Sequence, residues 1–313
     1  MVPMANPPDM SIDLAGVTLR NPVIAASGTS GYIDEFAHVL QPNLLGALVT
    51  KSISRAPWTG NPPWRIVDAR EGMLNAIGLA NVGLDRFLSE KLPKAASLDT
   101  VIIASICGNS IEEYVAVAEA FDAAPELPLV ELNVSCPNTD DGLVFGEHPA
   151  SLSQLVRAVR EVLKQTKMIV KLSPNVGDVR PLAKAAIEAG ADVLTLINTV
   201  SAMAIDVETR QPRLSRGTGG LSGPAIHPVA VRIVYEVYED VARSANVPII
   251  GLGGVMNWRD GAEMILAGAT AVGMGTALFV DPRAPGKVVK GLRKWVERQE
   301  VKSVRELVGQ VQV

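Results

Sequence analysis

The segment Met168–Asn198, MIVKLSPNVGDVRPLAKAAIEAGADVLTLIN, contains one full repeat of the pattern that decides the fold. An apolar run opens the segment at Met168–Leu172, and a second closes it at Val193–Asn198. Between them, Val179–Glu188 has helical periodicity, follows Asp178 as an N-cap and stops at Gly190, which suits the C′ position. Both runs are almost unbroken in apolar residues, which is typical of parallel strands buried on both faces. The segment therefore predicts a strand, a helix and a second strand parallel to the first.

The same unit recurs along the chain. Eight apolar runs predict strands: Pro22–Ser27, Ala47–Lys51, Val101–Ile106, Leu129–Val134, Met168–Leu172, Val193–Asn198, Pro248–Leu252 and Ala271–Gly275. Further helical patterns cover Ile111–Phe121, Leu152–Leu163 (after Ser151 as N-cap), Pro224–Val241 and Ala262–Leu266. Eight strands alternating with helices over about 250 residues favour an α/β fold of the (β/α)8 barrel type. We expect one barrel domain over residues 1–313, with long loops at Ser52–Asn81 and Thr199–Gly223. The alternative, a doubly wound sheet, usually has fewer strands and a glycine-rich first turn.

Composition excludes several classes of protein. The 313 residues are 48% hydrophobic and 20% charged, and the net charge of −4 argues against a broad nucleic-acid-binding surface. Two cysteines, Cys107 and Cys136, are too few for a disulfide framework or, without another chain, for an iron–sulfur cluster. Three histidines, His38, His148 and His227, lack metal-ligand spacing, so no metal site is predicted. The start of the chain does not resemble a signal peptide, and no apolar run approaches the roughly 18 residues of a membrane-spanning helix. We therefore expect a cytoplasmic protein that binds neither membrane nor nucleic acid.

Polar residues end nearly every predicted strand. In a (β/α)8 barrel the active site lies at the carboxyl ends of the strands. The residues found there are Ser27, Lys51, Ser52, Asn109, Asn133, Cys136, Lys171, Ser173, Asn198 and Thr199. Asn and Ser also end strands because they begin turns. That explanation does not cover Lys51 and Lys171, because a lysine inside an apolar run costs free energy unless an anion or polar ligand meets it.

Glycines at the last two strand ends indicate a phosphate site. Gly253–Gly254 follows the seventh predicted strand, and Gly275–Thr276 follows the eighth. Glycine-rich turns expose backbone N–H groups, and barrels often bind phosphate at these two turns. The alternative is that these small residues only let helices pack closely on strands.

The two cysteines have different predicted roles. Cys136 lies just past the fourth strand in ELNVSCPNTDDGLVFG, before a polar loop that could cover the barrel mouth. A thiol with a reference pKa of about 8.5 can act as a base or a nucleophile near neutrality when a neighbour assists. Cys107, beside Gly108, is expected to be a small packing residue.

Four strings in the sequence resemble one family. They are Asn133–Asn138 (NVSCPN), Asn75–Leu79 (NAIGL), Lys171–Asn175 (KLSPN) and Gly219–Ile226 (GGLSGPAI). They resemble the class 1 dihydroorotate dehydrogenases, most closely the class 1B catalytic subunit, over about Leu14 to Phe279. The resemblance implies FMN at the barrel mouth and oxidation of (S)-dihydroorotate to orotate in pyrimidine (UMP) biosynthesis. The stretch Trp64–Met73 departs from the family pattern, because it carries charge where a proline-glycine turn is expected.

The resemblance also implies a set of site residues. Cys136 would be the base that removes the C5 proton while hydride passes from C6 to flavin N5, and Lys171 would stabilise the negative charge of the reduced flavin. The FMN contacts would be Ser27, Lys51, Ser52, Asn109, Asn133, Lys171, Ile197, Gly223, Gly253, Gly254, Gly275 and Thr276. The substrate contacts would be Lys51, Asn75, Ala76, Ile77, Gly78, Leu79, Asn133, Asn198 and Thr199.

The electron acceptor is left open between two classes. Class 1B subunits pass electrons to NAD⁺ through a partner subunit with FAD and a [2Fe–2S] cluster, whereas class 1A homodimers use fumarate. We expect NAD⁺ as acceptor, and either a homodimer or a heterotetramer with such a partner. We expect no membrane extension of the class 2 type.

Three other functions fit parts of the sequence. A Schiff-base aldolase on the same fold would use Lys171 as nucleophile. A transfer-RNA dihydrouridine synthase is also a flavin barrel with a cysteine, but it would normally need a basic RNA-binding face. A non-catalytic flavin-binding protein would tolerate loss of Cys136, which this chain retains.

Overall fold

Eight parallel strands close into a barrel in the computed structural model, which describes residues 7–135 and 145–312. Neighbours around the barrel follow chain order, and the last strand pairs with the first. The strands are β3 (Val23–Ala25), β4 (Ala47–Val49), β7 (Val101–Ile106), β8 (Leu129–Asn133), β9 (Lys167–Leu172), β10 (Val193–Leu196), β15 (Ile249–Leu252) and β16 (Ala271–Met274). Each lies in or overlaps one of the eight predicted apolar runs, so the (β/α)8 prediction is confirmed and the doubly wound sheet is excluded.

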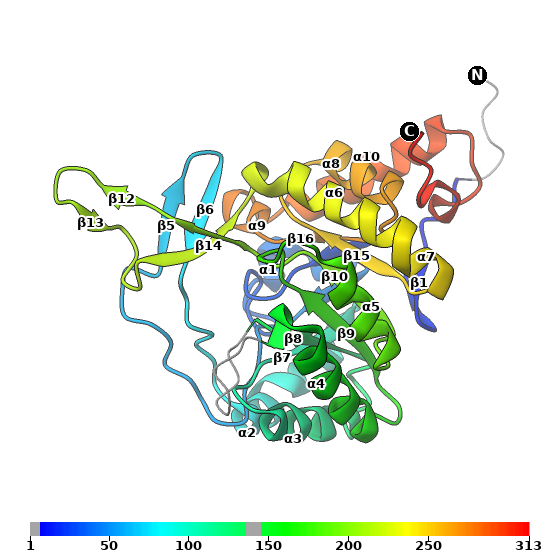
Figure 1. Cartoon of the computed structure of the whole chain (residues 1–313). Coiled ribbons are helices and arrows are strands. Elements are labelled where there is room, and N and C mark those ends of the chain that lie inside the picture. Colours follow the sequence, from blue (N-terminus) through cyan, green and yellow to red (C-terminus); the bar gives the residue numbers. More distant parts are fainter. Residues whose placement is uncertain (1–6, 136–144, 313) are drawn as a thin grey trace.

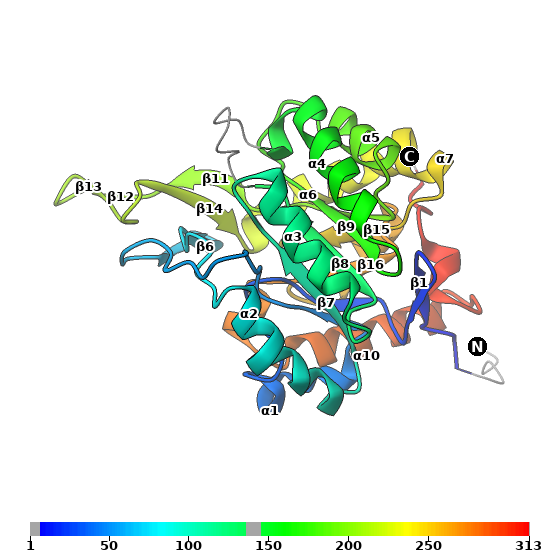
Figure 2. The same cartoon turned by 90° about the horizontal axis from the view of Figure 1, so that it is seen from below.

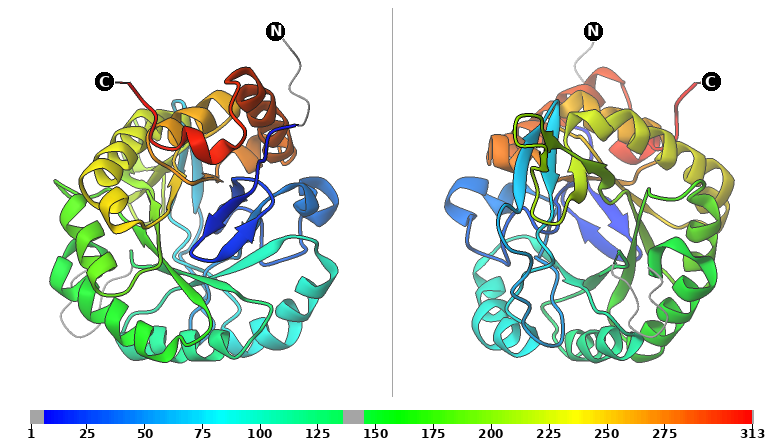
Figure 3. Two further views of the ribbon diagram at one scale, coloured as in Figure 1. Left: turned by 90° about the vertical axis from the view of Figure 1, so that its right-hand side faces the viewer. Right: turned by 60° about the vertical axis from the view of Figure 1, so that its left-hand side comes forward.

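Helices surround the barrel as an outer ring (Figure 3). Among the described residues, the helices of eight or more residues are α3 (Ile111–Asp122), α4 (Pro149–Val162), α5 (Arg180–Glu188), α6 (His227–Val237), α8 (Trp258–Leu266) and α10 (Ala284–Arg298). Shorter turns of helix are α1 (Ala37–Leu40), η1 (Pro42–Leu44), α2 (Leu84–Arg86), η2 (Phe87–Lys91), η3 (Leu92–Ser97), η4 (Phe145–Glu147), η5 (Pro224–Ile226), η6 (Tyr238–Ala242), α7 (Arg243–Ala245), α9 (Ala277–Val280) and η7 (Val304–Leu307). The apolar faces of the longer helices and the outward faces of the strands form one continuous buried cluster.

Three predicted helix starts were wrong. Helix α8 begins at Trp258 with Asn257 as N-cap, earlier than the predicted start at Ala262. Helix α4 begins at Pro149 with His148 as N-cap, so Ser151 lies inside the helix. Proline suits the first turn because its fixed φ is helical and the N–H that it lacks has no partner there. Helix α5 begins at Arg180 with Val179, and not Asp178, as its N-cap. Asp178 lies just before the N-cap, and its Oδ1 accepts a hydrogen bond from the Arg180 backbone N–H at 2.9 Å.

The two segments predicted as long loops contain strands that form a second sheet. Its order is β11 (Val200–Met203), β14 (Thr218–Ser222), β6 (Gly72–Asn75) and β5 (Ile66–Ala69), all antiparallel. Between β11 and β14, a small hairpin of β12 (Ile205–Asp206) and β13 (Gln211–Pro212) extends the sheet outward. We call β11, β14, β6 and β5 the upper sheet. It projects from one end of the barrel (Figures 1 and 2), and the charged stretch Trp64–Met73 supplies its β5–β6 hairpin.

The opposite end of the barrel carries the hairpin of β1 (Ile12–Leu14) and β2 (Val17–Leu19). Beside it, the Asp9 backbone N–H donates to the Lys302 carbonyl at 2.9 Å. In the described part of the chain, no helix is both long enough and apolar enough to cross a membrane. The barrel therefore has one end closed by a hairpin and another overlaid by the upper sheet.

Candidate active site

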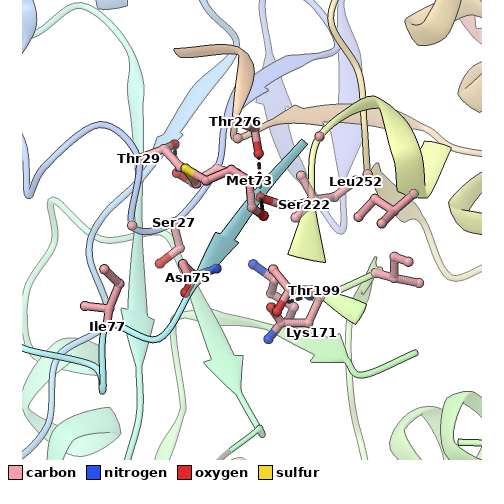
Figure 4. A pocket seen from close by; sticks show the side chains of 18 of the residues that line it. Ser27, Thr29, Met73, Asn75, Ile77, Lys171, Thr199, Ser222, Leu252 and Thr276 are labelled. Carbon is pink, nitrogen blue, oxygen red and sulfur yellow. Dashed lines mark hydrogen bonds between the residues drawn. The ribbon is translucent and has the colours of Figure 1, made fainter. Parts of the chain in front are cut away.

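A cavity of about 250 Å³ lies between the carboxyl ends of the barrel strands and the upper sheet. Side chains from both sheets face it, as Figure 4 shows for Ser27 and Lys171 from the barrel and for Met73 and Asn75 from β6. We call it the mouth cavity. Its position is the one that the fold reserves for an active site.

Most of the predicted site residues that the structure describes line the mouth cavity. They are Ser27, Lys51, Ser52, Asn75, Ile77, Leu79, Asn133, Lys171, Ile197, Asn198, Thr199, Gly223, Gly253, Gly254, Gly275 and Thr276. The strand-end rule and the resemblance therefore select residues that are brought together in space.

Four predicted residues in the described part of the chain do not line the mouth cavity. One is Ser173, whose Oγ accepts the Asn175 backbone N–H at 3.2 Å. The Asn109 backbone N–H donates to Glu113 Oε2 at 2.8 Å, which ties this residue to the start of α3. Ala76 donates its backbone N–H to the Arg65 carbonyl at 2.7 Å, and Gly78 packs closely against Asn61. Cys136 lies outside the described residues.

Several lining residues were not predicted. They are Ala26, Gly28, Thr29, Ile66, Met73, Ser222, Ile226, Leu252 and Phe279. Ser222 could have been found from its position in GGLSGPAI, and Thr29 from its position just past the first strand. Ile66 and Met73 belong to the upper sheet, so only knowledge of that sheet places them here.

A network of hydroxyls and amides fixes the floor of the mouth cavity. The Oγ atoms of Ser52 and Ser105 lie 2.8 Å apart, and Asn133 Nδ2 donates to Ser52 Oγ at 3.5 Å. Asn198 Nδ2 donates to Asn133 Oδ1 at 3.2 Å and to Ser135 Oγ at 2.7 Å. These bonds orient two amides in advance, and an oriented amide can offer both a donor and an acceptor to a planar polar ligand.

Two lysines supply positive charge to the mouth cavity. Burial, with a smaller contribution from the nearby Arg65 guanidinium, holds the pKa of Lys51 below its usual value near 10.5. Lys171 is only 7% exposed, and no residue in the described part of the chain accepts a hydrogen bond from its ammonium. A buried cation in this position favours an anionic ligand.

Four glycines line one part of the wall of the mouth cavity, and we call them the glycine cradle: Gly223, Gly253, Gly254 and Gly275. Gly253 has φ +147° and Gly254 has φ +66°. A Cβ on Gly253 would lie 2.5 Å from Ala230 Cβ, and one on Gly254 would lie 2.7 Å from the Gly223 carbonyl oxygen. Beside them, Thr276 Oγ1 donates to Ser222 Oγ at 2.7 Å (Figure 4). Backbone turns of this kind, with hydroxyls at their edge, suit a phosphate group.

Comparison with known proteins identifies the family. The family model described as dihydroorotate dehydrogenase matches residues 10–296. The chain belongs to the dihydroorotate dehydrogenase family. It is similar to the "Dihydroorotate dehydrogenase B (NAD(+)), catalytic subunit" of Geotalea uraniireducens, with 49% identity over 96% of this chain and 98% of that protein. The protein of the same name from Geobacter sulfurreducens is 47% identical over 98% of this chain and 99% of its own length.

These findings confirm the resemblance to class 1B dihydroorotate dehydrogenases. They also decide between the functions that the sequence left open, because an aldolase, a transfer-RNA dihydrouridine synthase and a non-catalytic flavin protein are not members of this family. The dihydroorotate dehydrogenase motifs NAIGL, NVSCPN and GGLSGPAI all contribute residues to one cavity, although they are far apart in the sequence.

Proposed function

We propose that this chain catalyses the FMN-dependent oxidation of (S)-dihydroorotate to orotate in pyrimidine biosynthesis. The observation that carries the proposal is the composition of the mouth cavity. A glycine cradle suited to phosphate and a set of oriented amides suited to a uracil-like ring line the same space, with two lysines nearby. Membership of the dihydroorotate dehydrogenase family supports this assignment.

The described residues fit FMN. Gly223, Gly253, Gly254, Gly275 and Thr276 all line the mouth cavity, and they would hold the FMN phosphate through backbone N–H groups and the Thr276 hydroxyl. Residues Ser27, Lys51, Ser52, Asn133, Lys171 and Ile197 would contact the rest of the cofactor. Asn109 does not line the mouth cavity, so only the resemblance supports a contact from it. Held there, FMN would supply the hydride acceptor for C6 of the substrate. Lys171 would place its positive charge where negative charge develops on reduction.

The amides and Lys51 fit the substrate. Asn75, Asn133 and Asn198 each offer a donor and an acceptor to the imide edge of dihydroorotate. Lys51 would meet the carboxylate. Asn75, Ile77 and Leu79, with Thr199, would cover the ring, whereas Ala76 and Gly78 do not line the cavity. Covering the substrate excludes water while the proton and the hydride leave.

We propose Cys136 as the base that removes the C5 proton. Its neighbour Ser135 accepts a hydrogen bond from Asn198, which lines the mouth cavity. This bond ties the chain immediately before Cys136 to the site. A thiolate in a place closed to water can act as a general base.

We propose that electrons leave through a partner subunit that carries FAD and a [2Fe–2S] cluster and reduces NAD⁺. The names of the relatives specify NAD⁺ and a catalytic subunit, and this chain has only two cysteines. The assembly would be a homodimer of this chain or a heterotetramer with that partner, in the cytoplasm. NAD⁺-dependent activity is expected only when the partner is added, and full activity of the isolated chain with NAD⁺ would contradict this part of the proposal.

The deciding experiment is anaerobic addition of L-dihydroorotate to the purified, FMN-loaded chain, with flavin absorbance as the readout. Bleaching of the flavin band, with orotate as product, is the expected result. A yellow protein that stays yellow would retain a flavin site but contradict the substrate. A chain that FMN cannot load would contradict the proposal as a whole.

A further inference from the structure

Glu131 and Lys171 are the two acidic or basic side chains that are buried in the described part of the chain. Glu131 is 2% exposed and Lys171 is 7% exposed. They lie on adjacent barrel strands, β8 and β9. Buried charges are rare unless they are paired, so one acid and one base on neighbouring strands require an explanation.

Both side chains point into the barrel. Asn133 and Lys171 line the mouth cavity, and Glu131, two residues before Asn133 on the same strand, faces the same way because side chains alternate along a strand. Thr195 on β10 is the register partner of Lys171 on β9. Thr195 Oγ1 donates to Glu131 Oε2 at 2.9 Å. Strand β9 lies between β8 and β10, and Glu131 is the register partner of Ile169 on β9. This bond therefore crosses the inner face of β9 between the levels of Ile169 and Lys171.

Each of the two groups has unused bonding capacity. Glu131 Oε1 is buried and has no hydrogen-bond partner among the described residues. The Lys171 ammonium likewise has no acceptor in that part of the chain. An unpaired buried carboxylate and an unpaired buried ammonium are both costly, and each reduces the cost of the other.

We propose that Glu131 is the counter-ion of Lys171 and acts as its positioning residue at the floor of the mouth cavity. The attraction acts through space inside the barrel, where the dielectric constant is low, and it keeps the ammonium directed between β8 and β10. The bond from Thr195 holds the Glu131 carboxylate in place for this role.

The pairing also bears on the proposed function, on which this part of the inference rests. Lys171 and Glu131 would bring opposite charges close to the position where reduced FMN carries negative charge. Glu131 would offset part of the effect of Lys171, so the pair, and not the lysine alone, would set how easily the flavin is reduced.

A double-mutant cycle in the full-length chain without FMN tests the pairing directly. Glu131→Gln keeps an acceptor for Thr195 but removes the charge, and Lys171→Met removes the ammonium with little change in shape. Each single variant is expected to unfold at a lower urea concentration than the parent, because it leaves one buried charge unpaired. The variant carrying both changes is expected to unfold at a higher urea concentration than either single variant.

Lys167→Met provides the matched control, because Lys167 is a lysine at the start of the same strand with its side chain 43% exposed. Its effect should add to that of Glu131→Gln without coupling. Additive effects for Glu131→Gln and Lys171→Met would overturn the pairing. If the single variants do not fold, recovery of folded protein in the double variant supports the pairing, and failure to recover overturns it.

The flavin midpoint potential then tests the link to function separately. In FMN-loaded protein, Glu131→Gln should shift the potential to more positive values, and Lys171→Met should shift it to more negative values. Coupling in urea with no shift of the potential in either variant would retain the through-space pairing of the two charges and overturn its role at the flavin. Failure to load FMN at all would contradict the proposed function and leave the urea result standing.

Discussion

The barrel and the upper sheet contribute to the same cavity but are built in different ways. The barrel strands are parallel and buried on both faces, and each pairs with the next barrel strand along the chain. The upper sheet is antiparallel and mostly half-buried, and its central pair joins Asn75 to Gly220, which are 145 residues apart. The barrel supplies Asn133, Lys171 and the glycine cradle, whereas β6 of the upper sheet supplies Asn75.

The two regions therefore suit different parts of the reaction. Groups on the barrel are fixed by neighbouring strands on both sides and by a buried polar network, so they suit the chemical step, which requires precise positions. Groups on the upper sheet are fixed mainly by antiparallel pairing at the surface, so they suit binding and covering of the substrate. This distinction would be wrong if substitutions in the upper sheet mainly reduced kcat, or if substitutions at the barrel strand ends mainly raised KM.

The largest effect is expected from Cys136→Ala, at a residue that follows barrel strand β8 in the sequence. Loss of a general base should reduce kcat by about 10²- to 10⁴-fold. Binding of FMN and orotate should persist, because neither depends on the thiol. Stopped-flow reduction of the flavin by dihydroorotate checks the rate, and absorbance titration checks the binding. Turnover close to that of the parent would show that another group removes the proton.

The second-largest effect, on KM for dihydroorotate, is expected from Gly219→Ala in β14. A Cβ on Gly219 would lie 2.4 Å from the Asn75 carbonyl oxygen, so β14 and β6 must move apart. Displacement of Asn75 should raise KM for dihydroorotate by about tenfold or more, with a smaller effect on kcat. Steady-state kinetics separate the two parameters.

Gly177→Ala is the matched control for this change, because its Cβ would meet no atom within 4 Å and its φ is not positive. It should leave KM unchanged. A large fall in kcat for Gly219→Ala, with KM constant, would remove the distinction between the two regions.

A smaller effect is expected from titration of Lys51. Burial and Arg65 lower the pKa of Lys51 from about 10.5. The protonated lysine attracts the substrate carboxylate, so orotate should bind well below this lowered pKa and more weakly as the pH rises through it. Lys51→Met should bind orotate less tightly, and its affinity should no longer fall as the pH rises through this range. The same fall in affinity in Lys51→Met would mean that another group causes it.

The smallest effect is expected at the outer edge of the upper sheet. Arg213 Nη2 lies 2.5 Å from Asp68 Oδ1, and the two side chains are 36% and 88% exposed. Because exposed ion pairs contribute little, Arg213→Ala should change neither the urea midpoint nor KM measurably. A marked rise in KM would mean that this contact orders the upper sheet over the substrate.

The same comparison explains what the sequence could predict. Barrel strands such as Val101–Ile106 are continuous apolar runs, and their strand ends could be read directly as site positions. The upper strands lack such a signal, because β5 contains Asp68, β14 begins Thr-Gly-Gly and each pairs with a distant segment. Local patterns do not report pairing over that distance, so these segments were predicted as loops.

The same lack of a local signal explains which residues of the candidate site could be predicted from the sequence. Asn133, Lys171 and Gly253 were predicted because each ends or follows a barrel strand. Met73 was not, because its place in the mouth cavity depends on the upper sheet. Asn109 follows a strand but is turned toward Glu113, a local hydrogen bond that the strand-end rule does not consider. The role of Cys136 stays a prediction.

The hydrogen bond between Asp9 and Lys302 has a practical consequence for electrochemistry. It joins residues near the two ends of the described chain at the face opposite the upper sheet (Figure 1), and an ion pair of Arg305 with Asp9 at 2.7 Å reinforces it. A surface tether attached beyond either residue would therefore anchor the molecule by its closed end. Molecules immobilised on an electrode in this way would all present the mouth cavity to the solution, so substrate and a soluble electron acceptor could reach it without crossing the support.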